Sequence, residues 1–140
     1  MIRVVFDTSV LYSAVFKQTS LPAAVFDLVV AGLVIPCVSP AVLAEYWEVL
    51  LERPALRPHR QRALQVLDSL AEVAIQVTPN RTLKISDHEE DNRFYECADA
   101  AGADYIVTSN TRHFNKPYKT TQIVNARQLL ERLAGTHWKE

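Results

Sequence analysis

The sequence has no excess of charge of either sign and very little cysteine. Its 140 residues carry 15 Lys and Arg against 16 Asp and Glu, which gives a formal net charge of −1. A global basic field that would attract nucleic acid is therefore excluded, and any contact with phosphates must come from local patches. The two cysteines, Cys37 and Cys97, lie in apolar surroundings, which predicts reduced core residues and no zinc site of the Cys/His type.

Long hydrophobic runs, repeats and low-complexity tracts are also missing. No apolar run reaches the length of a membrane span, and the chain opens directly on a predicted strand rather than on a targeting segment. We therefore expect a cytoplasmic protein with a single domain over residues 1–140. The single methionine and the two widely separated tryptophans offer no platform on which bases could stack.

Short apolar runs alternate with segments of helical periodicity along the chain. The runs predict strands at residues 2–6, 33–38, 73–75, 104–108 and 122–124. Helices are predicted at residues 9–16, 21–31, 40–52, 57–70, 89–101 and 126–133. Strands that alternate with helices predict a parallel sheet of about five strands with helices on both faces, which is a three-layer α/β/α sandwich.

Polar residues follow two of the predicted strands at the point where each strand ends. Asp7 comes directly after the first strand, and Asn110 follows the strand at residues 104–108. In open α/β sheets, ligands bind outside the carboxyl ends of the strands, so both residues are candidates for a site. Each also has a simpler interpretation, because Asp is a common helix cap and Asn is a common turn residue.

Glu45 lies in the predicted helix at residues 40–52. Helical spacing places it on one stripe with Glu48 and Glu52, opposite an apolar stripe that includes Trp47. That pattern is typical of a solvated acidic face. Glu45 differs from the other two glutamates because it lies within two turns of the helix start, near the end of the preceding strand.

Asp91 lies in the first turn of the predicted helix at residues 89–101. It shares a stripe with Phe94, Tyr95 and Ala98, which must face the sheet. A carboxylate on an inward stripe is costly unless it is paired, hydrogen-bonded or bound to a metal. Backbone amides of the first turn could also satisfy it, because the helix dipole favours a negative charge there.

These four residues are predicted to converge at the carboxyl edge of the sheet. Together Asp7, Glu45, Asp91 and Asn110 would present only oxygen ligands. Oxygen ligands suit Mg²⁺ or Mn²⁺ rather than zinc.

Four segments of the chain resemble, in order, the motifs of the PIN-domain ribonucleases, and most closely those of VapC-like toxins of type II toxin–antitoxin pairs. They are residues 4–11 (VVFDTSVL), 39–45 (SPAVLAE), 91–98 (DNRFYECA) and 102–110 (GADYIVTSN). Each motif alone is weak, but all four in this order cover essentially the whole chain. The resemblance implies a PIN-like fold and an Mg²⁺- or Mn²⁺-dependent endoribonuclease whose products carry a 5′-phosphate and a 3′-hydroxyl.

The resemblance also assigns roles to the candidate residues. It implies that Asp7, Glu45 and Asp91 are catalytic and hold the metal, with Asn110 at a fourth ligand position where the family commonly has Asp. An amide there removes one negative charge, and we expect a second metal ion to be held less tightly. We expect Thr8, Ser109 and Arg112, which flank these positions, to contact RNA. The basic run at residues 53–62 is instead typical of a solvated face.

The family further implies a homodimer that a cognate antitoxin protein silences. Two alternatives remain at this stage. The substitution at Asn110 is compatible with a catalytically weak module that binds RNA or a protein partner. Receiver domains and aspartyl phosphotransferases also place acids at strand ends with Mg²⁺, but those schemes give Glu45 no role.

Overall fold

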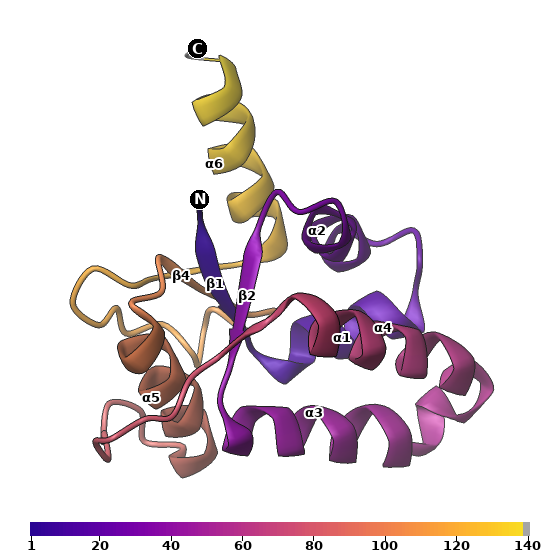
Figure 1. Cartoon of the computed structure of the whole chain (residues 1–140), viewed down its shortest axis with the longest axis horizontal. Helices are drawn as coiled ribbons and strands as arrows, with labels where there is room; N and C mark the ends of the chain where they lie inside the picture. The colour runs from indigo at the N-terminus through magenta and orange to yellow at the C-terminus, as the bar shows by residue number, and fades with distance from the viewer. Residues whose placement is uncertain (139–140) are drawn as a thin grey trace.

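A computed structural model of the chain describes residues 1–138 as a central sheet with helices on both faces (Figure 1). The strands are β1 (Arg3–Phe6), β2 (Ile35–Val38), β3 (Ile75–Gln76), β4 (Tyr105–Val107) and β5 (Gln122–Val124). They pair in parallel in the order β3-β2-β1-β4-β5. The predicted α/β sandwich with a parallel sheet of five strands is therefore confirmed.

Six α-helices connect or follow these strands. They are α1 (Thr8–Phe16), α2 (Leu21–Val30), α3 (Pro40–Glu52), α4 (Arg60–Val73), α5 (Asn92–Ala101) and α6 (Ala126–Trp138). Two short 3₁₀ helices, η1 (Pro54–His59) and η2 (Glu89–Asp91), precede α4 and α5. The α2 and α3 helices start where serine side chains cap them, since Ser20 and Ser39 accept hydrogen bonds from the backbone N–H groups of Ala23 and Val42.

The direction of the chain across the sheet determines where a ligand can bind. From β1 the chain proceeds to β2 and β3 in one direction, and then crosses back to β4 on the other side of β1. Because such crossovers are right-handed, α5 must cover the opposite face of the sheet from the helices between β1 and β3. Figure 1 shows α5 on one side of β1 and β2, with α1, α2 and α4 on the other. The strand order reverses between β1 and β4, which is the position where open α/β sheets bind ligands.

The core consists of the buried strands and the inner faces of the helices. Val4, Val5 and Phe6 of β1 are at most 1% exposed. On α5 the inward stripe holds Phe94, Tyr95 and Ala98, as the spacing predicted, and all three are buried. Both cysteines are free and buried, which confirms that they are core residues. Among the described helices, none combines the length and apolarity that crossing a membrane would require.

The helix boundaries around α4 differ from the prediction. The predicted helix at residues 57–70 begins only at Arg60, because residues 54–59 form η1. The first three residues of the predicted helix, 57–59, therefore belong to the 3₁₀ helix. The α4 helix then continues to Val73, and β3 forms at Ile75–Gln76 rather than at residues 73–75.

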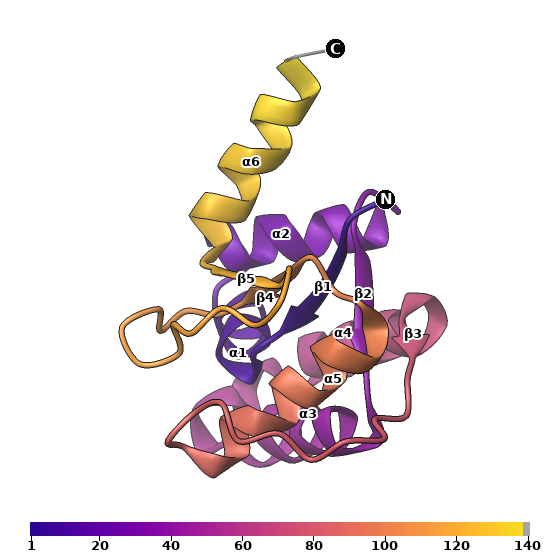
Figure 2. The same cartoon turned by 90° about the vertical axis from the view of Figure 1, so that its left-hand side faces the viewer.

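The last helix is longer than predicted. The α6 helix runs to Trp138 rather than ending at residue 133, and Figure 2 shows it projecting away from the sheet. It packs against α2 and β5.

The buried face of α3 also differs from the prediction, which placed Trp47 on the apolar stripe. Trp47 is 41% exposed, whereas Val42, Tyr46 and Leu50 face inward and are at most 1% exposed. The Tyr46 hydroxyl donates a hydrogen bond of 2.5 Å to the carbonyl oxygen of Phe6, the last residue of β1. This buried bond holds α3 against the carboxyl end of β1 and so rotates Trp47 outward.

Candidate metal site at the carboxyl edge of the sheet

Asp7 occupies the N-cap position of α1 but does not cap it. No backbone N–H of the first turn donates to its carboxylate. Instead, Oδ2 accepts two hydroxyl hydrogen bonds of 2.7 Å, one from Ser9 and one from Thr108 at the end of β4. The interpretation of Asp7 as a simple helix cap is therefore wrong, and its carboxylate is held between the two strands that flank the reversal of strand order.

The two hydroxyl groups that bind Asp7 are themselves fixed by the backbone. Ser9 Oγ accepts a hydrogen bond of 3.1 Å from the Ser109 N–H, and Thr108 Oγ1 accepts one of 3.1 Å from the Asn110 N–H. Because each oxygen accepts from an amide, its proton is free to point at Asp7. The turn after β4 and the carboxylate after β1 thus form one hydrogen-bonded unit.

Glu45 reaches the same edge of the sheet from α3. Its carboxylate accepts a hydrogen bond from the hydroxyl of Thr8, the first residue of α1, and Thr8 is only 6% exposed. Glu45 is half-buried, whereas Glu48 on the same helix is exposed. The Tyr46 bond to Phe6 places this part of α3 beside the end of β1. Of the three glutamates on the predicted acidic stripe, only Glu45 lines the site, and Glu48 and Glu52 do not.

Asp91 takes the N-cap position of α5, at the end of η2, and again no amide of the first turn donates to its carboxylate. Its nearest donor is the Ser86 hydroxyl, at 3.4 Å. The prediction placed Asp91 inside the first turn of an α-helix, but a 3₁₀ turn precedes α5 here. Backbone amides do not satisfy this half-buried carboxylate, so the simpler interpretation of Asp91 is also wrong.

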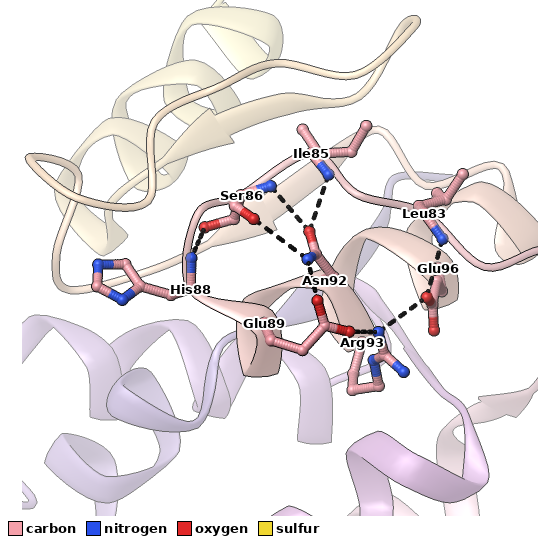
Figure 3. Close-up of polar contacts among 8 residues, drawn as sticks. All are labelled: Leu83, Ile85, Ser86, His88, Glu89, Asn92, Arg93 and Glu96. Carbon is pink, nitrogen blue, oxygen red and sulfur yellow. Dashed lines mark hydrogen bonds and ion pairs between the residues drawn. The ribbon is translucent and has the colours of Figure 1, made fainter.

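The neighbouring Asn92 fixes the chain around Asp91, as Figure 3 shows. Asn92 is 1% exposed, and its Oδ1 accepts hydrogen bonds of 2.9 and 2.8 Å from the N–H groups of Ile85 and Ser86. Its Nδ2 donates to the Ser86 carbonyl at 3.2 Å and to the Glu89 carboxylate at 3.0 Å. All of the hydrogen-bonding capacity of this buried amide is therefore used to hold the loop at residues 83–88 against the start of α5.

Asp7, Glu45 and Asp91 line one cleft of about 530 Å³, which we call the acidic cleft. Glu90 and Arg53 also line it, beside Tyr12, Ser13 and residues of α1 and α3. Burial raises the pKa of Glu45, and the charges of Asp7 and Asp91 raise it further, against a lowering by the Thr8 hydrogen bond. Burial likewise raises the pKa of Asp91, followed by the charge of Asp7. These carboxylates therefore repel one another across the cleft.

The residues of the acidic cleft fit a hard divalent cation by their chemistry. They offer carboxylate oxygens, and a cation would offset both the cost of burying these charges and the mutual repulsion, the two causes that raise the pKa values of Glu45 and Asp91. Among the described residues, however, no three His, Cys, Asp or Glu side chains are close enough together to hold one ion as they stand. Binding would require Asp91, whose carboxylate has a single hydrogen bond of 3.4 Å within residues 1–138, to turn toward Asp7 and Glu45, which hydroxyl hydrogen bonds hold at the cleft.

The other predicted site residues lie around this cleft. Asn110 is exposed and lines an adjoining cavity together with Asp7 and Asp91. Thr8 lines the acidic cleft but uses its hydroxyl on Glu45. Ser109 is exposed beside Ser9, and Arg112 is exposed in a further cavity beyond Asn110. Their contact with RNA stays a prediction.

Sequence reasoning missed the residues that orient the acids. Ser9 and Thr108 both donate hydrogen bonds to Asp7, and Thr108 lies 101 residues away from it in the sequence. Hydroxyl side chains such as these produce no periodic pattern from which the contacts could be predicted. Asn92 was not selected either, although it directly follows Asp91. The sequence places Arg53 in a basic run typical of a solvated face, but in the structure it lines the acidic cleft.

The chain also matches known proteins in sequence and in fold. Residues 3–112 match the PIN domain family, so the chain belongs to the PIN-domain family. An uncharacterized protein of Methanocaldococcus jannaschii, MJ1680, is 30% identical over 100 residues. That match covers 69% of this chain and 64% of the relative's length.

Two solved structures share the fold. One is DNA-bound VapBC from Salmonella typhimurium, with a TM-score of 0.59 and 15% identity over 90% of this chain and 99% of that one. The other is VapBC2 from Rickettsia felis bound to a fragment of promoter DNA, with a TM-score of 0.58 and 17% identity over 89% and 98% of the two chains. The expected resemblance to the PIN domains in sequence and fold is confirmed. The strand order 3-2-1-4-5 also differs from the 2-1-3-4-5 order of flavodoxin-like proteins such as receivers.

Proposed function

We propose that this chain is a divalent-metal-dependent endoribonuclease, with Mg²⁺ or Mn²⁺ as its cofactor. One observation carries the proposal. Carboxylates from the end of β1, from α3 and from the start of α5 line a single cleft at the reversal of strand order in a PIN-domain chain. Nucleases are general in this family, and phosphodiester hydrolysis is the chemistry that such a cleft serves best.

The roles of the residues follow from their positions. Asp7, Glu45 and Asp91 would hold the ion, and the Asn110 amide oxygen could contribute from the adjoining cavity. Held there, such an ion would supply Lewis-acid chemistry: it would polarise the phosphodiester and lower the pKa of the water molecule that attacks phosphorus. The hydroxyl groups of Ser9 and Thr108 keep Asp7 oriented, and Thr8 does the same for Glu45.

Cleavage of an RNA substrate by protein stripped of metal with EDTA tests the proposal. We expect cleavage when Mn²⁺ or Mg²⁺ is added back, and loss of cleavage in Asp7→Asn and in Asp91→Asn. Asp27→Asn, an exposed carboxylate on α2, is the matched control and should cleave like the wild type. Cleavage that persists in both site variants, or that does not depend on metal, would contradict the proposal.

We further propose that the chain is the toxin of a toxin–antitoxin pair and forms a homodimer. The two similar structures are VapBC complexes, which supports a cognate antitoxin as the partner. Induced expression should arrest bacterial growth for the wild type and not for Asp7→Asn, and the purified protein should have the mass of two chains in solution. Growth of the wild type at the rate of the variant would count against a toxin.

A second candidate is a catalytically weak module that binds RNA or a protein partner. It is favoured by Asn110 at the fourth position and by carboxylates that do not yet converge on one point. RNA binding that is insensitive to EDTA, without cleavage at high protein concentration in Mn²⁺, would support this module over the enzyme.

A further inference from the structure

The acidic cleft is the first of three adjoining cavities. It shares Asp7, Glu90 and Asp91 with an adjoining cavity, which we call the histidine cavity because His88 and His113 also line it. The two histidines in turn line a third cavity, the basic cavity. Its other lining residues are Ser86, Asp87, Tyr95, Arg112, Asn115 and Lys116. The three cavities therefore lie side by side in a row that runs from carboxylates to basic side chains, and we call this row the groove.

Two imidazole rings meet in the middle of this groove. His88 comes from the loop before α5 and His113 from the turn after β4, and their ring centroids are 6.4 Å apart with the planes at 89°. Both residues are exposed, and in the part of the chain that the structure describes neither ring forms a hydrogen bond. Figure 3 shows the His88 ring pointing away from the Asn92 cluster, which leaves the ring accessible.

Backbone hydrogen bonds hold the two segments that carry these rings. The His88 N–H donates to Ser86 Oγ at 3.1 Å, and Ser86 is bound through its own N–H to Asn92. The His113 N–H donates to the Asn110 carbonyl at 3.2 Å. The rings are therefore presented from fixed positions beside the proposed metal ligands, rather than from free loops.

The far end of the groove carries positive charge that the protein does not neutralise. Arg112 and Lys116 form no ion pair among the described residues, although Arg81, Arg93 and Lys119 all do. The Lys116 ammonium group donates instead to the carbonyl oxygen of Ile85 at 3.2 Å, which is a neutral partner. Asp87 is the carboxylate that shares this cavity, so the two cations outnumber it.

We infer that this groove binds an unpaired segment of RNA, with a base against His88 and His113 and its neighbouring phosphate between Arg112 and Lys116. The inference rests on the proposed function, since it places the scissile phosphate at the acidic cleft. Histidine is among the aromatic side chains on which unstacked RNA bases lie, and a base inside a duplex cannot reach such a ring. Two cations that outnumber one carboxylate, next to an aromatic pair, provide the positive charge and the stacking surface that proteins binding single strands combine.

Fluorescence anisotropy with a labelled, non-self-complementary RNA tests this inference. The measurement uses an Asp91→Asn background in EDTA, which prevents cleavage and reduces repulsion at the cleft. We expect the double variant His88→Ala, His113→Ala to bind this RNA about tenfold more weakly, with the slope of log K against log salt unchanged. The double variant Arg112→Gln, Lys116→Gln should lower the slope of log K against log salt by about 1.4, or about 0.7 for each charge.

The controls carry the same substitutions away from the groove. His59→Ala, and Arg57→Gln combined with Arg127→Gln, should bind like the background protein. The same RNA annealed to its complement should bind more weakly than the unpaired strand. The inference is wrong if the groove variants bind like the controls, if the duplex binds as tightly, or if the background protein binds no RNA at low salt.

The two proposals fail separately. Metal-dependent cleavage by the wild type with unaltered RNA binding in the groove variants would overturn the groove alone. Weakened RNA binding in the groove variants, together with a wild type that never cleaves, would support the groove and overturn the nuclease.

Discussion

Thr108 couples the end of β4 to the carboxylate that follows β1, so its hydroxyl should support both stability and metal affinity. The side chain is 0% exposed, donates to Asp7 Oδ2 at 2.7 Å and accepts from the Asn110 N–H at 3.1 Å. Thr108→Val keeps the shape and removes both bonds. Hydrogen bonds to charged groups contribute about 1.5–3 kcal/mol, so we expect the free energy of unfolding to fall by about 2 kcal/mol. For a chain of this length that lowers Tm by roughly 7 °C.

The same substitution should weaken metal binding, because Asp7 loses a group that orients it. Groups that orient metal ligands typically contribute a factor of about 10 to 100 in affinity. Urea denaturation measures the first effect, and calorimetric titration with Mn²⁺ measures the second. Both are needed, since a destabilised protein with normal metal affinity would show that Thr108 serves the fold alone.

Thr121 provides the matched control for this prediction. It is also a buried threonine, 4% exposed, and its hydroxyl donates to the Ala103 carbonyl at 2.6 Å, which is a neutral acceptor. Thr121→Val should cost about 1 kcal/mol of stability and leave Mn²⁺ affinity unchanged. If Thr108→Val bound Mn²⁺ as tightly as Thr121→Val does, Thr108 would serve the fold alone, and its role in orienting Asp7 for a metal ion would be refuted.

Three further predictions concern the acids and the loop that holds them. Burial and the charge of Asp7 raise the pKa values of Glu45 and Asp91. These carboxyl groups therefore stabilise the folded state most below about pH 4, and that stabilisation is lost as the pH rises through their pKa values in the folded protein. Mn²⁺ should therefore raise Tm more at neutral than at acidic pH, and a rise independent of pH would contradict this. Asn110→Asp should bind Mn²⁺ about tenfold more tightly in calorimetry, because it adds a charged ligand; unchanged affinity would place residue 110 outside the site. Asn92→Ala should lower the free energy of unfolding by about 3 kcal/mol and speed hydrogen exchange at the amides it binds, since it leaves buried amides without acceptors; an unchanged denaturation midpoint would refute that role.

The sequence predicted those parts of the site that follow directly from strand ends. Asp7 and Asn110 each follow a buried strand, and parallel strands bring their carboxyl ends to one edge of the sheet. That reasoning needs only the order of strands and helices, which the hydrophobic pattern supplied. The inward stripe of α5 was equally predictable, because Phe94 and Tyr95 lie at helical spacing from Asp91.

The orientation of α3 could not be predicted in the same way. Apolar residues occur around most of that helix, so periodicity alone did not separate Tyr46 from Trp47. Tyr46 is buried because its hydroxyl binds the end of β1, a contact between residues 40 positions apart. Long-range polar contacts leave no periodic trace, and the same holds for Thr108 with Asp7 and for the meeting of His88 with His113.

The loops around the site were predictable in extent but not in conformation. Residues 78–88 carry no regular pattern, and the buried amide of Asn92 determines how their last part folds. The boundary of α5 shifted because a 3₁₀ turn precedes it, which places Asp91 at the N-cap rather than within the helix. The loop conformation and the helix boundary depend on hydrogen bonds that form only once the sheet and helices are assembled.

Calorimetric titration of Mn²⁺ into EDTA-stripped protein tests the central claim most directly. The account predicts that the wild type and Asp27→Asn bind Mn²⁺ alike, whereas Asp91→Asn loses binding, because Asp91 and Asp7 serve one ion across the acidic cleft. Equal binding by all three proteins would show that Asp91 is not a ligand. No binding by the wild type would show that the three carboxylates do not form a metal site in the free protein.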